Sequence, residues 1–398
     1  MIRRTLMQCD QELVDFEIDP VTGDVRVIDA SPEGDELLAT IMPGVQDRNK
    51  ALFLFVRKRA ISPLRADKDD VIAAFGAKSP VGVVLMGHGL SLSDQFWYRA
   101  PGGNERWEDI NFFDNEWDPS FGAAAFKRDY SGLASCSPDT PDATTCGRAV
   151  KMWERGEDGI YLVKESLFPD GSDLVCAKLS ASLCAQVFDE GCCIPMAIVE
   201  RYGKLCSASP LMLVAGEEFA DGNRLRAIAG MQEEPGKGDG YPMSTELFQS
   251  LIEAYMAVGV SDASAHIARM ACCFCLTFTV DFHSGNFGII RKVGATTLRP
   301  APIFDFEGSF GISVDKSMAS TLIANIDLAK LYCASRFSFL DPSWDWSWYD
   351  PQAFEGFEER IEEALSAVQG LPPEFGKAAA GLFTMQRTYV NSVVSAQA

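Results

Sequence analysis

The chain has 398 residues, a length that predicts two or three packed units rather than one small core. Its 47% hydrophobic and 23% charged residues are typical of a globular protein. A formal net charge of −21 argues against a broad nucleic-acid surface, because phosphate contacts need clustered lysines and arginines. We therefore expect no direct nucleic-acid binding, although a small polyanionic ligand needs only a few local cations.

Neither a secretion signal nor a membrane span is expected. The N-terminal sequence MIRRTLMQCDQELVDFE has arginines but no apolar segment after them. The longest apolar run, near 270–280, is too short to cross a bilayer. These features favour a cytoplasmic protein without membrane contact.

The 12 cysteines are dispersed along a large chain, which favours reduced thiols over disulfides. Cys272 and Cys275 have C-x-x-C spacing, with Cys273 between them. The segment is apolar and has no supporting Cys or His pair, so we interpret these thiols as small buried hydrophobes rather than zinc ligands.

The N-terminal third is predicted to be mixed. Residues 13–29 form two alternating runs around a Thr-Gly-Asp turn, which indicates a β-hairpin. Residues 81–86 are a short buried strand or helix. Residues 91–126 are irregular but rich in aromatic side chains, and we expect a packed connector.

A small β-rich unit with one helix follows a loop at 132–147. The sequence predicts a strand over 159–163 that ends at Lys164, and a helix over 173–188 with apolar residues near one face. Short strands are expected at 195–202 and 211–215.

The remainder is predicted to be mainly helical after a loop at 232–242. The expected elements are helices at 244–258 and 261–278, strands at 287–291 and 297–303, and helices at 351–369 and 374–395.

A cluster of polar residues separates the helix at 261–278 from the two strands. The stretch TVDFHSGNFGII holds Asp281, His283 and Asn286 within six residues. Asp305 follows Asp281 by 305 − 281 = 24 residues, which leaves room for one β-hairpin. Such a hairpin would return Asp305 beside Asn286, where a carboxylate and an amide oxygen can share a hard cation.

Phosphoryl transfer needs a cation for phosphates, an acid that positions it, a carboxylate near the attacking hydroxyl, and metal ligands. Candidates occur in a suitable order: Lys164, Asp173, Asp281, Asn286 and Asp305. Each alone has an ordinary structural explanation, such as a helix N-cap for Asp173 or a turn residue for Asp281. The combined order favours phosphoryl transfer. His283 is interpreted as a structural residue that bonds to nearby backbone.

Several motifs resemble those of the HipA-like serine/threonine kinases. DFHSGN resembles their D-x-H-x-x-N loop, and IFDF resembles their metal-binding aspartate motif. GIYLVK looks like their nucleotide-lysine strand, and SDLVCAKL looks like the start of the next helix. The aromatic connector is also similar, so the resemblance covers roughly residues 90–310.

The resemblance implies an α+β, bilobal protein-kinase-like fold. Residues 1–130 would form an N-terminal accessory subdomain that includes the aromatic connector. Residues 131–230 would form a small β-rich nucleotide-binding lobe, and residues 231–398 a helical catalytic lobe.

It also implies ATP and Mg²⁺ as cofactors, with ATP between the lobes. Lys164 would hold the α- and β-phosphates, and Asp281 would position the substrate hydroxyl and accept its proton. Asn286 and Asp305 would hold Mg²⁺. The lysine would be paired with Asp173, which is one carbon shorter than the glutamate of the family pattern. The adenine would lie near three consecutive residues, Glu217, Glu218 and Phe219.

The loop before the lysine strand matches the family spacing at Thr144, Gly147 and Lys151. Gly147 would let the backbone approach phosphate, and Lys151 would add positive charge. The resemblance further implies self-phosphorylation of a loop hydroxyl, at Thr144 or its neighbour Thr145, which would repel ATP.

The resemblance implies a protein kinase that phosphorylates a serine or threonine hydroxyl, with a small helix-turn-helix antitoxin as a partner. Two alternatives stay open. A small-molecule phosphotransferase would use a similar set of acidic and amide groups. A nucleotide-binding pseudokinase would act as an interaction protein, and the Asp173 replacement is its sequence support.

Overall fold

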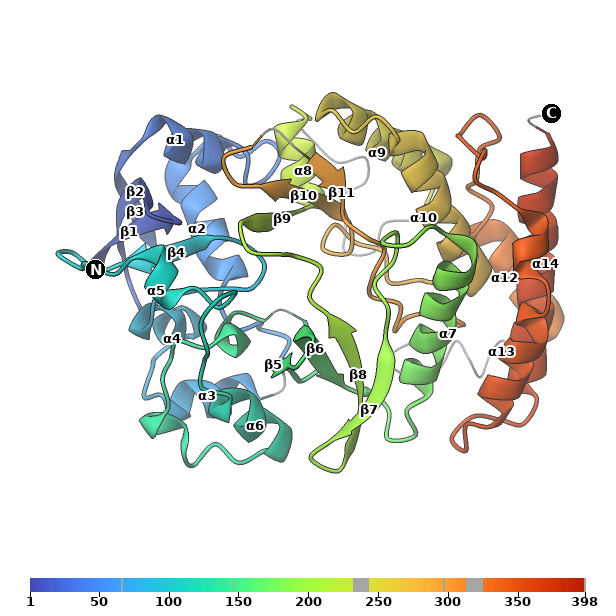
Figure 1. Ribbon diagram of the computed structural model, residues 1–398, viewed down its shortest axis with the longest axis horizontal. Helices are drawn as coiled ribbons and strands as arrows, with labels where there is room; N and C mark the ends of the chain where they lie inside the picture. The colour runs from blue at the N-terminus through green and yellow to red at the C-terminus, as the bar shows by residue number, and fades with distance from the viewer. Residues whose placement is uncertain (66, 146, 232–242, 296–297, 313–324, 397–398) are drawn as a thin grey trace.

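The computed structural model describes residues 1–65, 67–145, 147–231, 243–295, 298–312 and 325–396. The predicted loop at 232–242 lies outside the described residues, as does Thr297, the first residue of one predicted strand. Within the described residues the strands form three sheets. Figure 1 shows the first among the N-terminal helices, and the other two between that part and the C-terminal helices.

The first sheet belongs to the N-terminal part of the chain and has the order β3-β2-β1-β4. The predicted hairpin is confirmed, because β2 and β3 pair antiparallel across the Thr-Gly-Asp turn. One apolar core joins this sheet to α1 and α2. The elements of this part are β1 (Ile2–Gln8), β2 (Gln11–Ile18), β3 (Val25–Ala30), α1 (Pro32–Ala39), α2 (Arg48–Lys58), α3 (Lys68–Ala74), α4 (Pro80–Met86), β4 (Phe96–Arg99), α5 (Trp107–Ile110) and α6 (Ser120–Lys127).

The second sheet has the order β5-β6-β8-β7, and all its pairs are antiparallel. The single long helix that the sequence predicts, α7, lies between β6 and β7 in the chain. The elements are η1 (Leu133–Ser135), η2 (Pro141–Thr144), β5 (Lys151–Gly156), β6 (Gly159–Glu165), α7 (Ser172–Val187), β7 (Ala197–Arg201) and β8 (Lys204–Pro210).

The third sheet has the order β11-β10-β9, and most of the C-terminal helices pack in one large apolar core beside it. Helix α10 is central in this core, since it contacts α7, α9 and α14 and is buried along almost its whole length. The elements are β9 (Glu217–Asp221), α8 (Gly222–Ile228), α9 (Thr245–Ala257), α10 (Ala263–Thr277), β10 (Gly288–Lys292), β11 (Leu298–Pro300), α12 (Ile326–Arg336), η3 (Pro351–Phe354), α13 (Phe357–Ser366) and α14 (Phe375–Ser395).

One element prediction needs correction, and one open alternative is decided. The strand predicted at 211–215 is wrong: β8 ends at Pro210, and the apolar residues after it form a connector that lines a cavity. Sequence analysis missed β8 itself, because its alternating positions carry small side chains such as Ser207 and Ser209 rather than large apolar ones. The apolar run at 81–86 is the short helix α4.

The observed mixture of sheets and helices confirms the predicted α+β organisation. The described cysteines are free thiols, and Cys272, Cys273 and Cys275 are buried in the large core, as expected for small apolar side chains. Among the helices that the structure describes, none has the length and apolar character to cross a membrane. The boundaries at 130/131 and 230/231 stay a prediction.

Candidate active site

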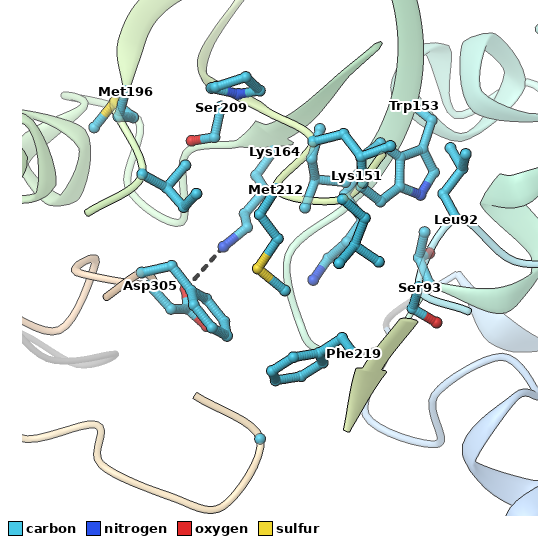
Figure 2. A pocket seen from close by; sticks show the side chains of 18 of the residues that line it. Leu92, Ser93, Lys151, Trp153, Lys164, Met196, Ser209, Met212, Phe219 and Asp305 are labelled. Carbon is cyan, nitrogen blue, oxygen red and sulfur yellow. Dashed lines mark hydrogen bonds and ion pairs between the residues drawn. The ribbon is translucent and has the colours of Figure 1, made fainter. Parts of the chain in front are cut away.

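A cavity of about 310 Å³ lies between the second sheet, the third sheet and the aromatic connector. Its volume is in the range of small-molecule sites. Figure 2 shows apolar side chains around a space that receives the ammonium groups of Lys151 and Lys164. The lining residues used below are Leu92, Ser93, Thr144, Thr145, Lys151, Trp153, Lys164, Leu211, Met212, Leu213, Phe219, Gly285, Asp305 and Glu307.

Lys164 projects from β6 toward two carboxylates of one loop. Its Nζ atom lies 2.8 Å from Oδ1 of Asp305 and 3.1 Å from Oε1 of Glu307. Burial alone would lower the pKa of Lys164, but the two negative charges outweigh it and raise that pKa overall. Burial likewise acts to raise the pKa of Asp305, whereas the Lys164 charge holds it well below its usual range. The lysine and Asp305 are therefore both charged.

The loop that carries Asp305 lies against the DFHSGN loop. Asp305 has a positive φ of 67°, a conformation that aspartate tolerates better than most residues. The Val280 N–H donates to Gly308 O, and a Cβ atom added at Gly308 would lie 3.0 Å from the Asp281 Cβ. Glycine at this position therefore lets the two loops approach closely.

Hydrogen bonds between its own residues stabilise the DFHSGN loop. The buried Asn286 donates from Nδ2 to Asp281 O at 3.0 Å, so its amide oxygen is the end suited to a cation. The Gly285 N–H donates to Nδ1 of His283 at 3.0 Å, which confirms the predicted structural role of this histidine.

Asp281 is the exposed carboxylate of this loop, with a side chain that is 62% accessible. Partial loss of hydration and the nearby charge of Asp305 raise its pKa. The antiparallel hairpin of β10 and β11 connects this loop to Asp305, as predicted from the 24-residue spacing. Asp281, Asn286 and Asp305 thus come from two adjoining loops.

The loop before β5 lies on another side of the cavity. Thr144 ends η2, and its hydroxyl donates to Leu90 O and Pro141 O at 3.2 and 3.1 Å. The buried Thr145 donates to Asp142 O at 3.0 Å. Both threonines line the cavity.

Gly147 lies in this loop, close to the side chain of Lys151 at the start of β5. Gly147 has a φ of 97°, which favours glycine, and a Cβ atom there would lie 2.8 Å from Lys151 Nζ. Lys151 pairs in register with Lys164 across β5 and β6, and its charge helps lower the pKa of Asp305. Two cationic side chains of adjacent strands therefore reach the same cavity (Figure 2).

Asp173 does not form the predicted pair with Lys164. Its carboxylate accepts hydrogen bonds from the Ser166 hydroxyl and from the Leu167 N–H, the latter at 2.8 Å. Asp173 is also not the N-cap of α7, since Gly171 has that position. The carboxylate therefore fixes the turn after β6.

The predicted adenine segment is only partly at the cavity. Phe219 lines it and makes an edge contact with Phe304. The Glu217 carboxylate binds Arg299 at 3.0 Å and accepts from the Val214 N–H, so it is engaged elsewhere.

Glu218 is fully buried away from this cavity, in an ion pair with Arg224 and Arg291. In place of the two glutamates, three residues of the segment after β8 line the cavity: Leu211, Met212 and Leu213.

Sequence analysis missed Glu307 and Ser93. Glu307 stands two residues after Asp305 in FDFEG, so its spacing from a predicted metal ligand was an available signal. Ser93 comes from the aromatic connector, and its carbonyl oxygen accepts the Phe219 N–H at 2.9 Å. The aromatic connector therefore forms part of the wall of the cavity.

No family model matches the chain, and no curated protein matches its sequence. Solved structures do match its fold. One is the complex of HipA, HipB and operator DNA from the toxin–antitoxin system of Shewanella oneidensis MR-1, at a TM-score of 0.51 and 12% identity over 99% of both chains. Another is the proinflammatory kinase CtkA of Helicobacter pylori, at a TM-score of 0.44 and 12% identity, covering 64% of this chain and 92% of that one. The full-length match confirms the fold expected from the DFHSGN and IFDF motifs: the chain has a HipA-like kinase fold.

Proposed function

We propose that the chain is an ATP- and Mg²⁺-dependent kinase that transfers the γ-phosphoryl group of ATP to a serine or threonine hydroxyl of a protein. One observation carries the proposal. Lys164 and Asp305 line a single cavity that also reaches the DFHSGN loop. The cavity therefore combines a cation for phosphates with oxygen ligands for a metal ion, as phosphoryl transfer requires.

Each residue has a role that follows from its position. Lys164 and Lys151 place positive charge where the phosphates of a nucleotide would lie. The exposed carboxylate of Asp281 would orient the substrate hydroxyl and accept its proton. The raised pKa of Asp281 improves its ability to accept that proton.

The oxygen donors fit a hard divalent cation. Asp305 supplies a carboxylate that stays ionised, and Asn286 supplies an amide oxygen whose NH₂ group is already bonded to the loop. When bound there, Mg²⁺ would offset the negative charge of the phosphates. Asp281, which is more exposed, is left to act on the hydroxyl.

The base of the nucleotide would lie against apolar side chains. Met212 and Phe219 approach from one side, and Trp153 from β5 approaches from another (Figure 2). Leu213 also lines the cavity. This placement moves the expected adenine position from Glu217 and Glu218 toward the connector after β8. An aromatic and aliphatic lining suits a flat, weakly polar base.

Incubation with ATP labelled at the γ-phosphate tests the reaction. The protein is supplied with a whole-cell lysate in one arm and with a panel of metabolites in the other. The proposal predicts labelled protein on serine or threonine. Labelled metabolites alone would indicate the small-molecule phosphotransferase, and a nucleotide-dependent rise in melting temperature without any transfer would indicate the pseudokinase.

Self-phosphorylation of Thr144 or Thr145 is part of the proposal. The Thr144 hydroxyl is bonded to two carbonyl oxygens, so the loop must open before that hydroxyl can react. A phosphate there would carry about two negative charges beside the cavity and oppose ATP binding. Mass spectrometry of the parent and of Asp281→Asn should find phosphate only in the parent. An unmodified loop in an active kinase would remove this switch.

We also propose a small antitoxin with a helix-turn-helix pattern as a partner. The support is the Shewanella complex, which contains HipA, HipB and operator DNA. Because that complex contains operator DNA, it does not support our expectation that the present chain makes no direct contact with nucleic acid. A short reading frame next to the gene, and co-purification of its product with the chain, would test the partner.

A further inference from the structure

The acid that positions the nucleotide lysine does not come from α7. Asp173 is buried and accepts hydrogen bonds from Ser166 and Leu167, which fix the turn between β6 and α7. Lys164 is instead bonded to Asp305 and Glu307. If Asp305 serves a cation, the carboxylate that stays with the lysine is Glu307.

The backbone of the loop explains how two carboxylates reach one ammonium. Asp305 has a positive φ, which turns the chain at this residue. Phe306 is buried, so its side chain anchors the loop between the two acids. Glu307 Oε1 then lies 3.1 Å from Lys164 Nζ.

Helix α7 supports this loop rather than the lysine. The Ser180 hydroxyl on α7 donates to Ser309 Oγ at 2.9 Å, and the Ser309 hydroxyl donates to Phe306 O at 2.6 Å. Both serines are fully buried. The helix therefore acts on Lys164 through the loop that carries Glu307.

We propose that Glu307 is a positioning residue for Lys164 and takes the role that sequence analysis assigned to Asp173. The inference rests on the proposed function for its consequence in catalysis, but the contact can be tested without a nucleotide. Glu307 keeps the ammonium directed into the cavity while Asp305 is engaged with a cation.

The first test measures how tightly the lysine is held. Parent, Glu307→Gln and Asp173→Asn are treated with an amine-acylating ester, and acylation of Lys164 is followed by mass spectrometry. Glu307→Gln should react roughly tenfold faster, because the carboxylate that accepts from the ammonium is replaced by a neutral amide oxygen and the contact weakens. Asp173→Asn, the matched control, should react like the parent. Faster acylation in Asp173→Asn and not in Glu307→Gln would overturn the inference.

The second test measures transfer with the same proteins. Glu307→Gln should raise KM for ATP and lower kcat/KM by roughly 10- to 100-fold, while its dependence on Mg²⁺ concentration stays that of the parent. Glu307→Asp should recover part of the loss. Unfolding temperatures identify a variant that has merely lost stability.

The two tests distinguish failure of the proposed function from failure of the positioning role of Glu307. An inactive parent whose lysine still responds to Glu307→Gln contradicts the proposed function and leaves the positioning contact supported. An active parent with unchanged kinetics and unchanged acylation in Glu307→Gln contradicts the positioning role alone.

Discussion

Two ion clusters in this molecule, one half-buried and one around a fully buried carboxylate, have opposite compositions. The lysine cluster (Lys164, Asp305 and Glu307) joins one cation to two carboxylates at the edge of the large cavity. The arginine cluster (Glu218, Arg224 and Arg291) joins one carboxylate to two cations.

The two clusters also differ in exposure. Glu218 is 0% accessible, although its arginines border a smaller cavity of about 150 Å³. Burial acts to raise the Glu218 pKa, but Arg224 and Arg291 outweigh it and lower that pKa. Burial raises the Glu307 pKa to about 7 despite the Lys164 charge, so an added cation at this cavity would favour the ionised carboxylate, whereas Glu218 is already neutralised by its two arginines.

The arginine cluster also ties distant parts of the chain together. Gln8 on β1 donates to Glu218 at 2.9 Å, and Arg224 and Arg291 reach Glu218 from α8 and β10. Substitutions in the lysine cluster should therefore affect the proposed phosphoryl transfer, whereas substitutions in the arginine cluster should affect stability.

The largest expected effect is on transfer next to the lysine cluster. Asp281→Asn should reduce phosphate transfer by about 10²- to 10⁴-fold, the usual scale for a positioned base, and leave ATP binding nearly intact. Steady-state transfer and equilibrium ATP binding measure the two quantities. A folded variant with undiminished transfer would remove Asp281 from the mechanism.

The next effect is on stability at the arginine cluster. Glu218→Gln should lower the free energy of unfolding by about 3–5 kcal/mol, because the buried guanidinium group of Arg224 and the half-buried one of Arg291 lose their shared carboxylate. Urea denaturation measures this change. The matched control, Glu217→Gln, breaks the more exposed pair with Arg299 and should cost less than about 1 kcal/mol. Equal losses in both variants would contradict the structural role of the arginine cluster.

A smaller effect concerns Asp142, a buried carboxyl held chiefly by hydrogen bonds. Burial raises its pKa to about 7, despite the Trp153 N–H that donates to it at 2.6 Å. Between about pH 4 and pH 7 the folded protein keeps this proton while the unfolded chain loses it. Stability should therefore fall as pH rises through this interval, by about 1.4 kcal/mol for each pH unit.

Asp142→Asn should flatten that dependence, because an amide has no proton to lose in this interval. Thermal unfolding of both proteins at a series of pH values makes the comparison. A parent whose stability rises through the same interval, with no difference from the variant, would show that Asp142 is ionised in the folded state.

The sequence predicted the position in the fold of the candidate site residues that lie in short polar loops between regular elements. Asp281, Asn286 and Asp305 could be placed from their spacing, because one hairpin fits between the two loops. Lys164 could be placed because it ends an alternating strand. Local patterns were sufficient in each case.

Contacts between distant segments could not be predicted in this way. The direction of the Asp173 side chain depends on the N–H of Leu167 in the preceding turn. The burial of Glu218 depends on arginines from α8 and β10, and the contact between Glu307 and Lys164 joins residues 143 positions apart. Such contacts follow from tertiary packing, which one sequence does not display.

Calorimetric titration of ATP into the parent and into Asp305→Ala, each with and without Mg²⁺, tests the central claim most directly. We propose that the lysine cluster binds a nucleotide through Lys164 and its metal ion through Asp305. The parent should bind ATP more tightly with Mg²⁺ present, and Asp305→Ala should lose that gain because a hard cation needs oxygen ligands. An equal Mg²⁺ dependence in both proteins, or no ATP binding by the parent, would contradict the account.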